Sequence, residues 1–168
     1  MQTDLPITFA LTDHFETRVD QSSYAGKWML VFFGFTNCRA VCPRNLGKLS
    51  EALALFPELA DEIQPLYVTV DPARDTPAVM REFLEDRFPR FTGLTGNEAE
   101  IGRAKEDFGV FARRVDEGEG QYQMPHTALT YLLDRRGRYR GHWPSVLEVE
   151  EIGDRIRRTF ESERDGED

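Results

Sequence analysis

The sequence has no long apolar segment, and its longest uninterrupted apolar run is WMLVFF at positions 28–33. A helix that spans a bilayer needs about 20 mostly apolar residues. The opening residues, MQTDLPITFALTDHF, also lack the basic start and the apolar stretch of a signal peptide. We therefore expect neither a membrane-spanning helix nor a signal peptide in this sequence.

Basic residues are few relative to acidic ones, because Lys and Arg number 21 against 30 Asp and Glu, a net charge of -9. Such a chain is a poor candidate for binding nucleic acid or an anionic membrane surface. It is compatible with a cationic partner or a metal cation. The length of 168 residues, 40% of them hydrophobic, predicts one domain over 1–168 with a real core. We expect its acidic tail, from about residue 161, to fray.

Cysteine is scarce too, since Cys38 and Cys42 are the only two and both lie in VFFGFTNCRAVCPRNL. Two are too few for a disulfide scaffold. The apolar run at 28–35 predicts a strand buried on both faces, and Pro43 predicts a helix that runs to about Phe56. The cysteines therefore flank a strand-to-helix turn. There they can form a disulfide, a redox pair or half of a metal site, which we favour over two buried free thiols.

Other apolar runs predict further strands, and capping residues predict further helices. The strands are expected at 63–71 and 126–134, with a returning strand at 139–143 and an N-terminal hairpin over 7–20; the helices begin near Thr76, Asn97 and Ser145. Alternation of strands and helices predicts an α/β fold, with a central mixed sheet flanked by helices and an N-terminal β-hairpin. Sites in such sheets gather at the carboxyl ends of strands, where the cysteines lie.

Histidine offers three candidate ligands, His14, His126 and His142. Soft thiolates select copper(I), zinc or iron–sulfur clusters, and a structural zinc site needs four protein ligands. We interpret His14 and His142 as surface residues. His126 begins the strand predicted at 126–134, a position where a histidine taken alone is more often structural than a ligand. If that strand runs antiparallel to 28–35, His126 lies at the same sheet edge as the cysteines.

The motif VTVDPARDTP, at 68–77, places further polar groups at the end of a strand. Asp71 ends the second strand and is either a turn-former or a group that orients a ligand. Asp75 is expected to cap the next helix together with Thr76, and Arg74 to form an ion pair with Asp75.

Four segments, GKWMLVFFGFTNCRAVCPRNL, VTVDPARDTP, FTGLTG and MPHTALTYLLDRRGRY, together resemble the Sco (SenC/PrrC) family of copper proteins, from about Phe9 to the final helix. The resemblance implies a thioredoxin-like fold and one copper ion, Cu(I) or Cu(II), held by Cys38, Cys42 and His126. It also implies a role in maturing the binuclear copper centre of cytochrome c oxidase. Its partners would then be the copper-bearing subunit of that oxidase and other copper chaperones.

Members of this family are usually tethered by an N-terminal membrane helix and face the periplasm or the mitochondrial intermembrane space. We expect the present chain to be the soluble domain of such a protein, on the periplasmic side of the inner membrane. The ligands match the family, but neighbouring residues differ. Asn37 stands where the family usually has His, Arg39-Ala40 where it has Pro-Asp, and Pro125 where it has Asp. Arg39 places a cation between the thiols, which should favour thiolate.

Several functions stay open at this point. The first is a copper metallochaperone, and the second is a thiol–disulfide oxidoreductase that uses Cys38 and Cys42 as a redox pair. A copper or redox sensor is a further alternative. A peroxidase of the same fold superfamily is disfavoured, because GFTN before Cys38 lacks the expected proline-initiated loop. His126 discriminates between the first two, since a copper site needs it and an oxidoreductase does not.

Overall fold

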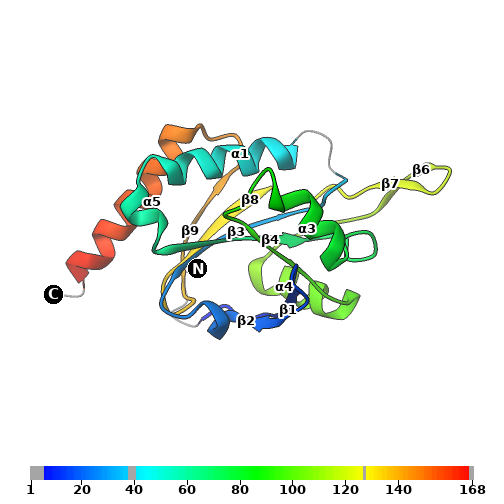
Figure 1. Ribbon diagram of the computed structural model, residues 1–168, viewed down its shortest axis with the longest axis horizontal. Helices are drawn as coiled ribbons and strands as arrows, with labels where there is room; N and C mark the ends of the chain where they lie inside the picture. The colour runs from blue at the N-terminus through cyan, green and yellow to red at the C-terminus, as the bar shows by residue number, and fades with distance from the viewer. Residues whose placement is uncertain (1–5, 38–40, 127, 167–168) are drawn as a thin grey trace.

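A computed structural model describes residues 6–37, 41–126 and 128–166. Its main feature is a seven-stranded sheet with the order β2-β1-β5-β4-β3-β8-β9 (Figure 1). The strands of this sheet are β1 (Ala10–Asp13), β2 (Arg18–Asp20), β3 (Trp28–Gly34), β4 (Ile63–Thr69), β5 (Thr92–Thr95), β8 (Leu129–Leu133) and β9 (Tyr139–Pro144). β3 pairs in parallel with β4 and antiparallel with β8, and β4 pairs in parallel with β5. The predicted mixed sheet and N-terminal hairpin, β1 with β2, are confirmed.

Helices cover both faces of the sheet (Figure 1). The helical elements are η1 (Gln21–Tyr24), α1 (Val41–Ala54), α2 (Pro57–Ala60), α3 (Pro77–Glu85), α4 (Glu98–Phe108) and α5 (Val149–Gly166). α1, α3 and α5 share one core cluster with the sheet, and α4 shares the other. None of these helices, within the described ranges, is long and apolar enough to cross a membrane.

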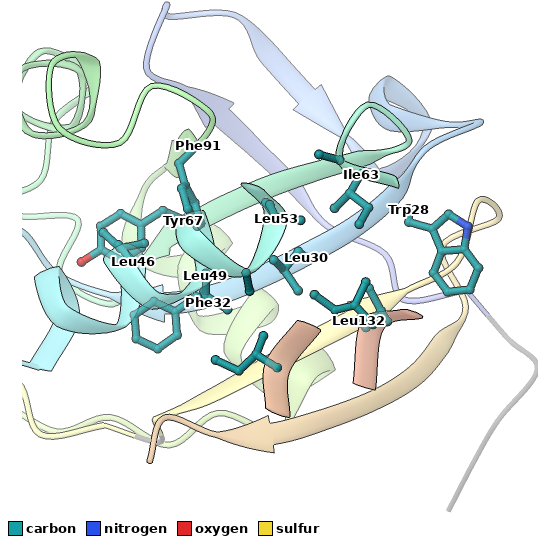
Figure 2. Close-up of a cluster of buried hydrophobic side chains, with 14 of the residues drawn as sticks. Trp28, Leu30, Phe32, Leu46, Leu49, Leu53, Ile63, Tyr67, Phe91 and Leu132 are labelled. Carbon is teal, nitrogen blue, oxygen red and sulfur yellow. The ribbon is translucent and has the colours of Figure 1, made fainter. Parts of the chain in front are cut away.

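β3 lies at the centre of the core because every one of its residues is buried. Successive side chains of a strand point to opposite faces. Trp28, Leu30 and Phe32 accordingly pack under α1 and α5 (Figure 2), whereas Met29, Val31 and Phe33 pack toward α4. β3 is buried on both faces because helices cover each face of the sheet, and this explains its continuous apolar run.

Helix boundaries agree with the capping residues in two of three cases. The Thr76 side chain accepts a hydrogen bond from the Val79 amide and caps α3, and Asn97 with Glu100 forms the predicted capping box of α4. The C-terminal helix begins at Val149, so the expectation that Ser145 opens it was wrong. α5 also continues to Gly166, so the tail expected to fray is helical that far.

The sequence did not predict a separate two-stranded hairpin, made of β6 (Val115–Gly118) and β7 (Gln121–Gln123). Its strands are polar and largely exposed, so they carry no apolar alternation that would reveal them. Figure 1 shows this hairpin projecting from the end of the sheet at which α1 begins. It leads directly into the segment that carries His126.

Candidate metal centre

His126 lies at the carboxyl end of β3. Its Nε2 is 3.0 Å from the Phe33 carbonyl oxygen, and its Nδ1 is 2.9 Å from the Met124 carbonyl oxygen. Its ring meets that of Phe35 edge-on, with 5.8 Å between centroids. The expectation that His126 sits at this edge is confirmed, because β8 does run antiparallel to β3.

The strand itself begins later than expected, at Leu129 rather than at His126. Pairing between β3 and β8 ends at Phe32 opposite Thr130. Beyond that point the imidazole, instead of a β8 amide, reaches the Phe33 carbonyl. The backbone of His126 is held on its other side, through a bridge to Ala112 and the Arg113 amide, which donates to the Pro125 carbonyl at 3.0 Å. This arrangement fixes the ring beside the start of the cysteine loop, the segment 35–40 that connects β3 to α1.

The cysteine loop starts where β3 ends. Phe35 is buried, Thr36 is half-buried and Asn37 is exposed, while Cys38 lies outside the described residues. α1 begins at Val41 instead of at Pro43, which places the backbone of Cys42 in the first turn of the helix. Among the described residues, no group of three or more His, Cys, Asp and Glu side chains is close enough to hold a metal ion. The ligand set Cys38, Cys42 and His126 therefore stays a prediction.

The other two histidines differ from each other. His142 is exposed on β9 beside Tyr139, as expected of a surface residue. His14 is not on the surface, because only 7% of it is exposed and its Nδ1 accepts a hydrogen bond of 2.9 Å from the Gly93 amide. The interpretation of His14 as a surface turn residue was wrong. It failed because the contact with Gly93 depends on the pairing of β1 with β5, which no local pattern indicated.

His14 makes folding stability depend on pH. Burial lowers the pKa of His14 below its ordinary value of 6.5, opposed by Asp13 and Glu85 and assisted by Arg81. Because the folded state disfavours protonation, the stabilisation is present above the unfolded pKa and is lost as pH falls through the lower folded pKa. We expect the free energy of unfolding to fall as pH drops below 6.5.

A His14→Asn variant keeps an acceptor for the Gly93 amide but does not titrate. Urea unfolding of both proteins at several pH values measures the difference between them. The wild type should lose stability relative to the variant as pH drops through this range. Parallel curves for the two proteins would show that His14 does not carry the effect.

Asp71 is buried and tied to the β6–β7 hairpin. β4 ends at Thr69, so the expectation that Asp71 ends this strand was wrong by two residues. Its Oδ1 accepts a hydrogen bond of 2.8 Å from the Tyr122 hydroxyl, and its Oδ2 forms an ion pair with Arg74. The Arg74 guanidinium also stacks 3.6 Å from the centre of the Tyr122 ring and donates to the Tyr122 carbonyl at 3.0 Å. The expected ion pair between Arg74 and Asp75 was wrong, since Arg74 instead pairs with Asp71.

Asp75 does not cap the next helix, a role that Thr76 fills alone. It has no exposed surface, and its carboxylate accepts hydrogen bonds from the Thr36 amide, the Thr36 hydroxyl and the Thr69 hydroxyl, at 3.0, 2.5 and 2.7 Å. Burial raises the pKa of Asp75 above its ordinary value, and the hydrogen bonds from Thr36 and Thr69 oppose that shift. Sequence reasoning missed this contact between Asp75 and Thr36. The sequence offers only a weak signal for it, a threonine at or just after the end of β3 and of β4.

The chain is similar to known proteins along nearly its whole length. Residues 2–161 match the SCO1/SenC family model. The SCO2-like protein of Rickettsia felis is 37% identical over 137 residues, which are 80% of this chain and 67% of that protein.

Two solved structures share the fold. Bradyrhizobium japonicum ScoI, solved with copper bound, has a TM-score of 0.82 at 39% identity, covering 90% of this chain and 97% of that one. Yeast Sco1, also solved with copper bound, has a TM-score of 0.86 at 31% identity, covering 95% and 90%. The thioredoxin-like fold implied by the sequence resemblance is thus confirmed. The chain belongs to the SCO1/SenC family.

Proposed function

We propose that this protein is a copper metallochaperone that holds one copper ion through Cys38, Cys42 and His126. In this role it helps to mature the binuclear copper centre of cytochrome c oxidase. The observation that carries the proposal is the placement of the His126 imidazole against Phe33 and Phe35, where the chain leaves β3 for the cysteines. Copper is the cargo of such a protein, so binding must be firm and also reversible.

The donor set suits both oxidation states of copper. Two thiolates favour copper(I), and an imidazole nitrogen allows the site to accept copper(II) as well. A helix N-terminus favours thiolate, and the backbone of Cys42 lies in the first turn of α1. Each His126 nitrogen lies at a backbone carbonyl, so one nitrogen exchanges its carbonyl for the metal. The other nitrogen then stays hydrogen-bonded and orients the ring, as outer partners of metal-bound histidines do.

Family membership supports the copper cargo, since Bradyrhizobium japonicum ScoI and yeast Sco1 were both solved with copper bound. We extend the proposal to the client, the copper-bearing subunit of cytochrome c oxidase, and to exchange with other copper chaperones. The place of action that we propose is the periplasmic side of the inner membrane.

Asp71 is proposed to support the site without binding the metal. Its carboxylate is occupied by Tyr122 and Arg74, which leaves it poorly placed to act as a copper ligand. Tyr122 lies only four residues before His126. Asp71 therefore holds the segment that leads to His126, which is the role of an orienting group.

The cysteines provide the first test, because oxidation should switch copper binding off. In air the two thiols lose two protons and two electrons to dioxygen and form one sulfur–sulfur bond, which their spacing across a turn allows. We expect thiol titration of air-exposed protein to find no free thiols and metal analysis to find no bound copper. After reduction under argon, one copper(I) should bind per chain. Two persistently reactive thiols in air, or copper binding by the oxidised protein, would contradict the proposal.

A thiol–disulfide oxidoreductase is the second candidate, favoured by the position of Cys42 in the first turn of α1. The two functions differ in their need for His126. Reduction of a client disulfide should survive His126→Ala, whereas copper(II) binding should not. Both assays on the same variant therefore separate the candidates.

A further inference from the structure

Asp75 is a buried carboxylate that the proposed copper site does not yet use. It has no exposed surface, and in the described part of the chain it forms no ion pair with Lys, Arg or His. A buried charge without a cation is costly unless hydrogen bonds satisfy it. Three donors do so here, two from Thr36 and one from Thr69.

What Asp75 holds is the exit of β3. Thr36 follows β3 and lies two residues before Cys38, and both its amide and its hydroxyl donate to the Asp75 carboxylate. Thr69 is the last residue of β4, and the hydroxyl of Thr95, the last residue of β5, donates to the Asp75 carbonyl at 2.7 Å. One residue therefore joins the carboxyl ends of three neighbouring strands.

The same short segment also holds the chain that leads to His126. The Asp75 amide donates to the Asp71 carbonyl at 2.9 Å, which closes the turn over residues 71–75. Two other residues of that turn, Asp71 and Arg74, bind Tyr122. The turn consequently contacts the cysteine loop on one side and the approach to His126 on the other.

We propose that Asp75 is a positioning residue for the copper site. Through Thr36 it fixes where the chain leaves the sheet before Cys38, and through the turn over 71–75 it links that exit to the segment that leads to His126. The inference rests on the proposed function for its copper readout, but the disulfide of Cys38 and Cys42 gives a readout that needs no metal. Partners hydrogen-bonded to a metal ligand typically contribute roughly 10- to 100-fold to metal affinity, and Asp75, which acts one step further out through Thr36, should lie at the lower end of that range.

The test replaces Asp75 by alanine, which removes all three acceptors. A matched control is Asp134→Ala, because Asp134 is also buried, at 3% exposure against 0% for Asp75, and accepts several bonds, from Arg136, Arg138 and Arg140. Asp134 follows β8, which is antiparallel to β3. It therefore lies near the amino end of β3, at the opposite end of the strands from His126. Both variants should unfold at lower temperature than the wild type, and only Asp75→Ala should alter the site.

Two quantities are measured below the unfolding temperature of every variant. In anaerobic competition with a chromophoric chelator, Asp75→Ala should bind copper(I) about tenfold more weakly, and Asp134→Ala should match the wild type. In glutathione redox buffers, the Asp75→Ala disulfide should be easier to reduce, on the order of tenfold in equilibrium constant, because a loosened loop holds the thiols together less well. Thr36→Val removes only the hydroxyl donor to Asp75, so it should change both quantities in the same direction but by less. It replaces Asp75→Ala in the test if Asp75→Ala does not fold.

The outcomes are distinct. If folded Asp75→Ala has the copper(I) affinity and the disulfide equilibrium of the wild type, the inference is overturned and the proposed copper site is unaffected. The same holds for Thr36→Val where it replaces Asp75→Ala. Equal losses in Asp75→Ala and Asp134→Ala would also overturn it, because general destabilisation would then be sufficient. If the wild type binds no copper(I) but Asp75→Ala alone shifts the disulfide equilibrium, the proposed function fails while the positioning role of Asp75 stands.

Discussion

Replacing Cys42 by serine is expected to abolish tight copper(I) binding. A serine hydroxyl is a hard donor that stays protonated, so the soft copper(I) ion would keep one thiolate of the two proposed. The loss should exceed the roughly 10- to 100-fold that removal of an orienting neighbour costs. Anaerobic competition titration against a chromophoric copper(I) chelator measures it.

Asn37, in the loop between β3 and α1, provides a matched control. Asn37 is exposed and is not a proposed ligand, so Asn37→Ser should bind copper(I) as the wild type does. Circular dichroism establishes that both variants are folded. Wild-type affinity in Cys42→Ser, at one copper per chain, would mean that the metal is held elsewhere.

Replacing His126 by alanine should separate the two oxidation states. Copper(I) accepts few, soft donors, so Cys38 and Cys42 should still hold it, weakened on the order of 10- to 100-fold. Copper(II) prefers nitrogen and oxygen donors, and two thiolates without imidazole would tend to reduce it. We therefore expect His126→Ala to lose the sulfur-to-copper(II) charge-transfer band while copper(I) remains bound.

His142→Ala is the control for this experiment, because His142 is an exposed histidine on the neighbouring strand β9. It should keep the charge-transfer band and the copper(I) affinity of the wild type. A stable band in His126→Ala would rule out His126 as the ligand. Loss of the band in His142→Ala would point to that residue in its place.

The sequence predicted the parts of the fold that local patterns control. The apolar run at 28–35 predicts β3, because a strand buried on both faces has consecutive apolar residues. Asn97 with Glu100 predicts the start of α4, because a capping box involves residues only three positions apart. The place of His126 followed from one further assumption, that its strand runs antiparallel to β3, and this was correct.

The parts that failed depend on long-range contacts. The bonds between Thr36 and Asp75 join residues 39 apart, so local capping rules assigned Asp75 to the nearest helix instead. His14 is buried by a contact with Gly93, 79 residues away. The β6–β7 hairpin is polar, and Tyr122 on it is held between the guanidinium groups of Arg74 and Arg114, a contact that periodicity cannot reveal.

The central claim is that Cys38, Cys42 and His126 together bind one copper ion. X-ray absorption at the copper edge tests it most directly, because the fine structure counts sulfur and nitrogen neighbours of the metal. For the copper(I)-loaded wild type we predict two sulfur donors and one nitrogen donor, with the nitrogen shell absent in His126→Ala. A nitrogen shell that survives in His126→Ala, or a wild-type site with fewer than two sulfur donors, would contradict the proposed site.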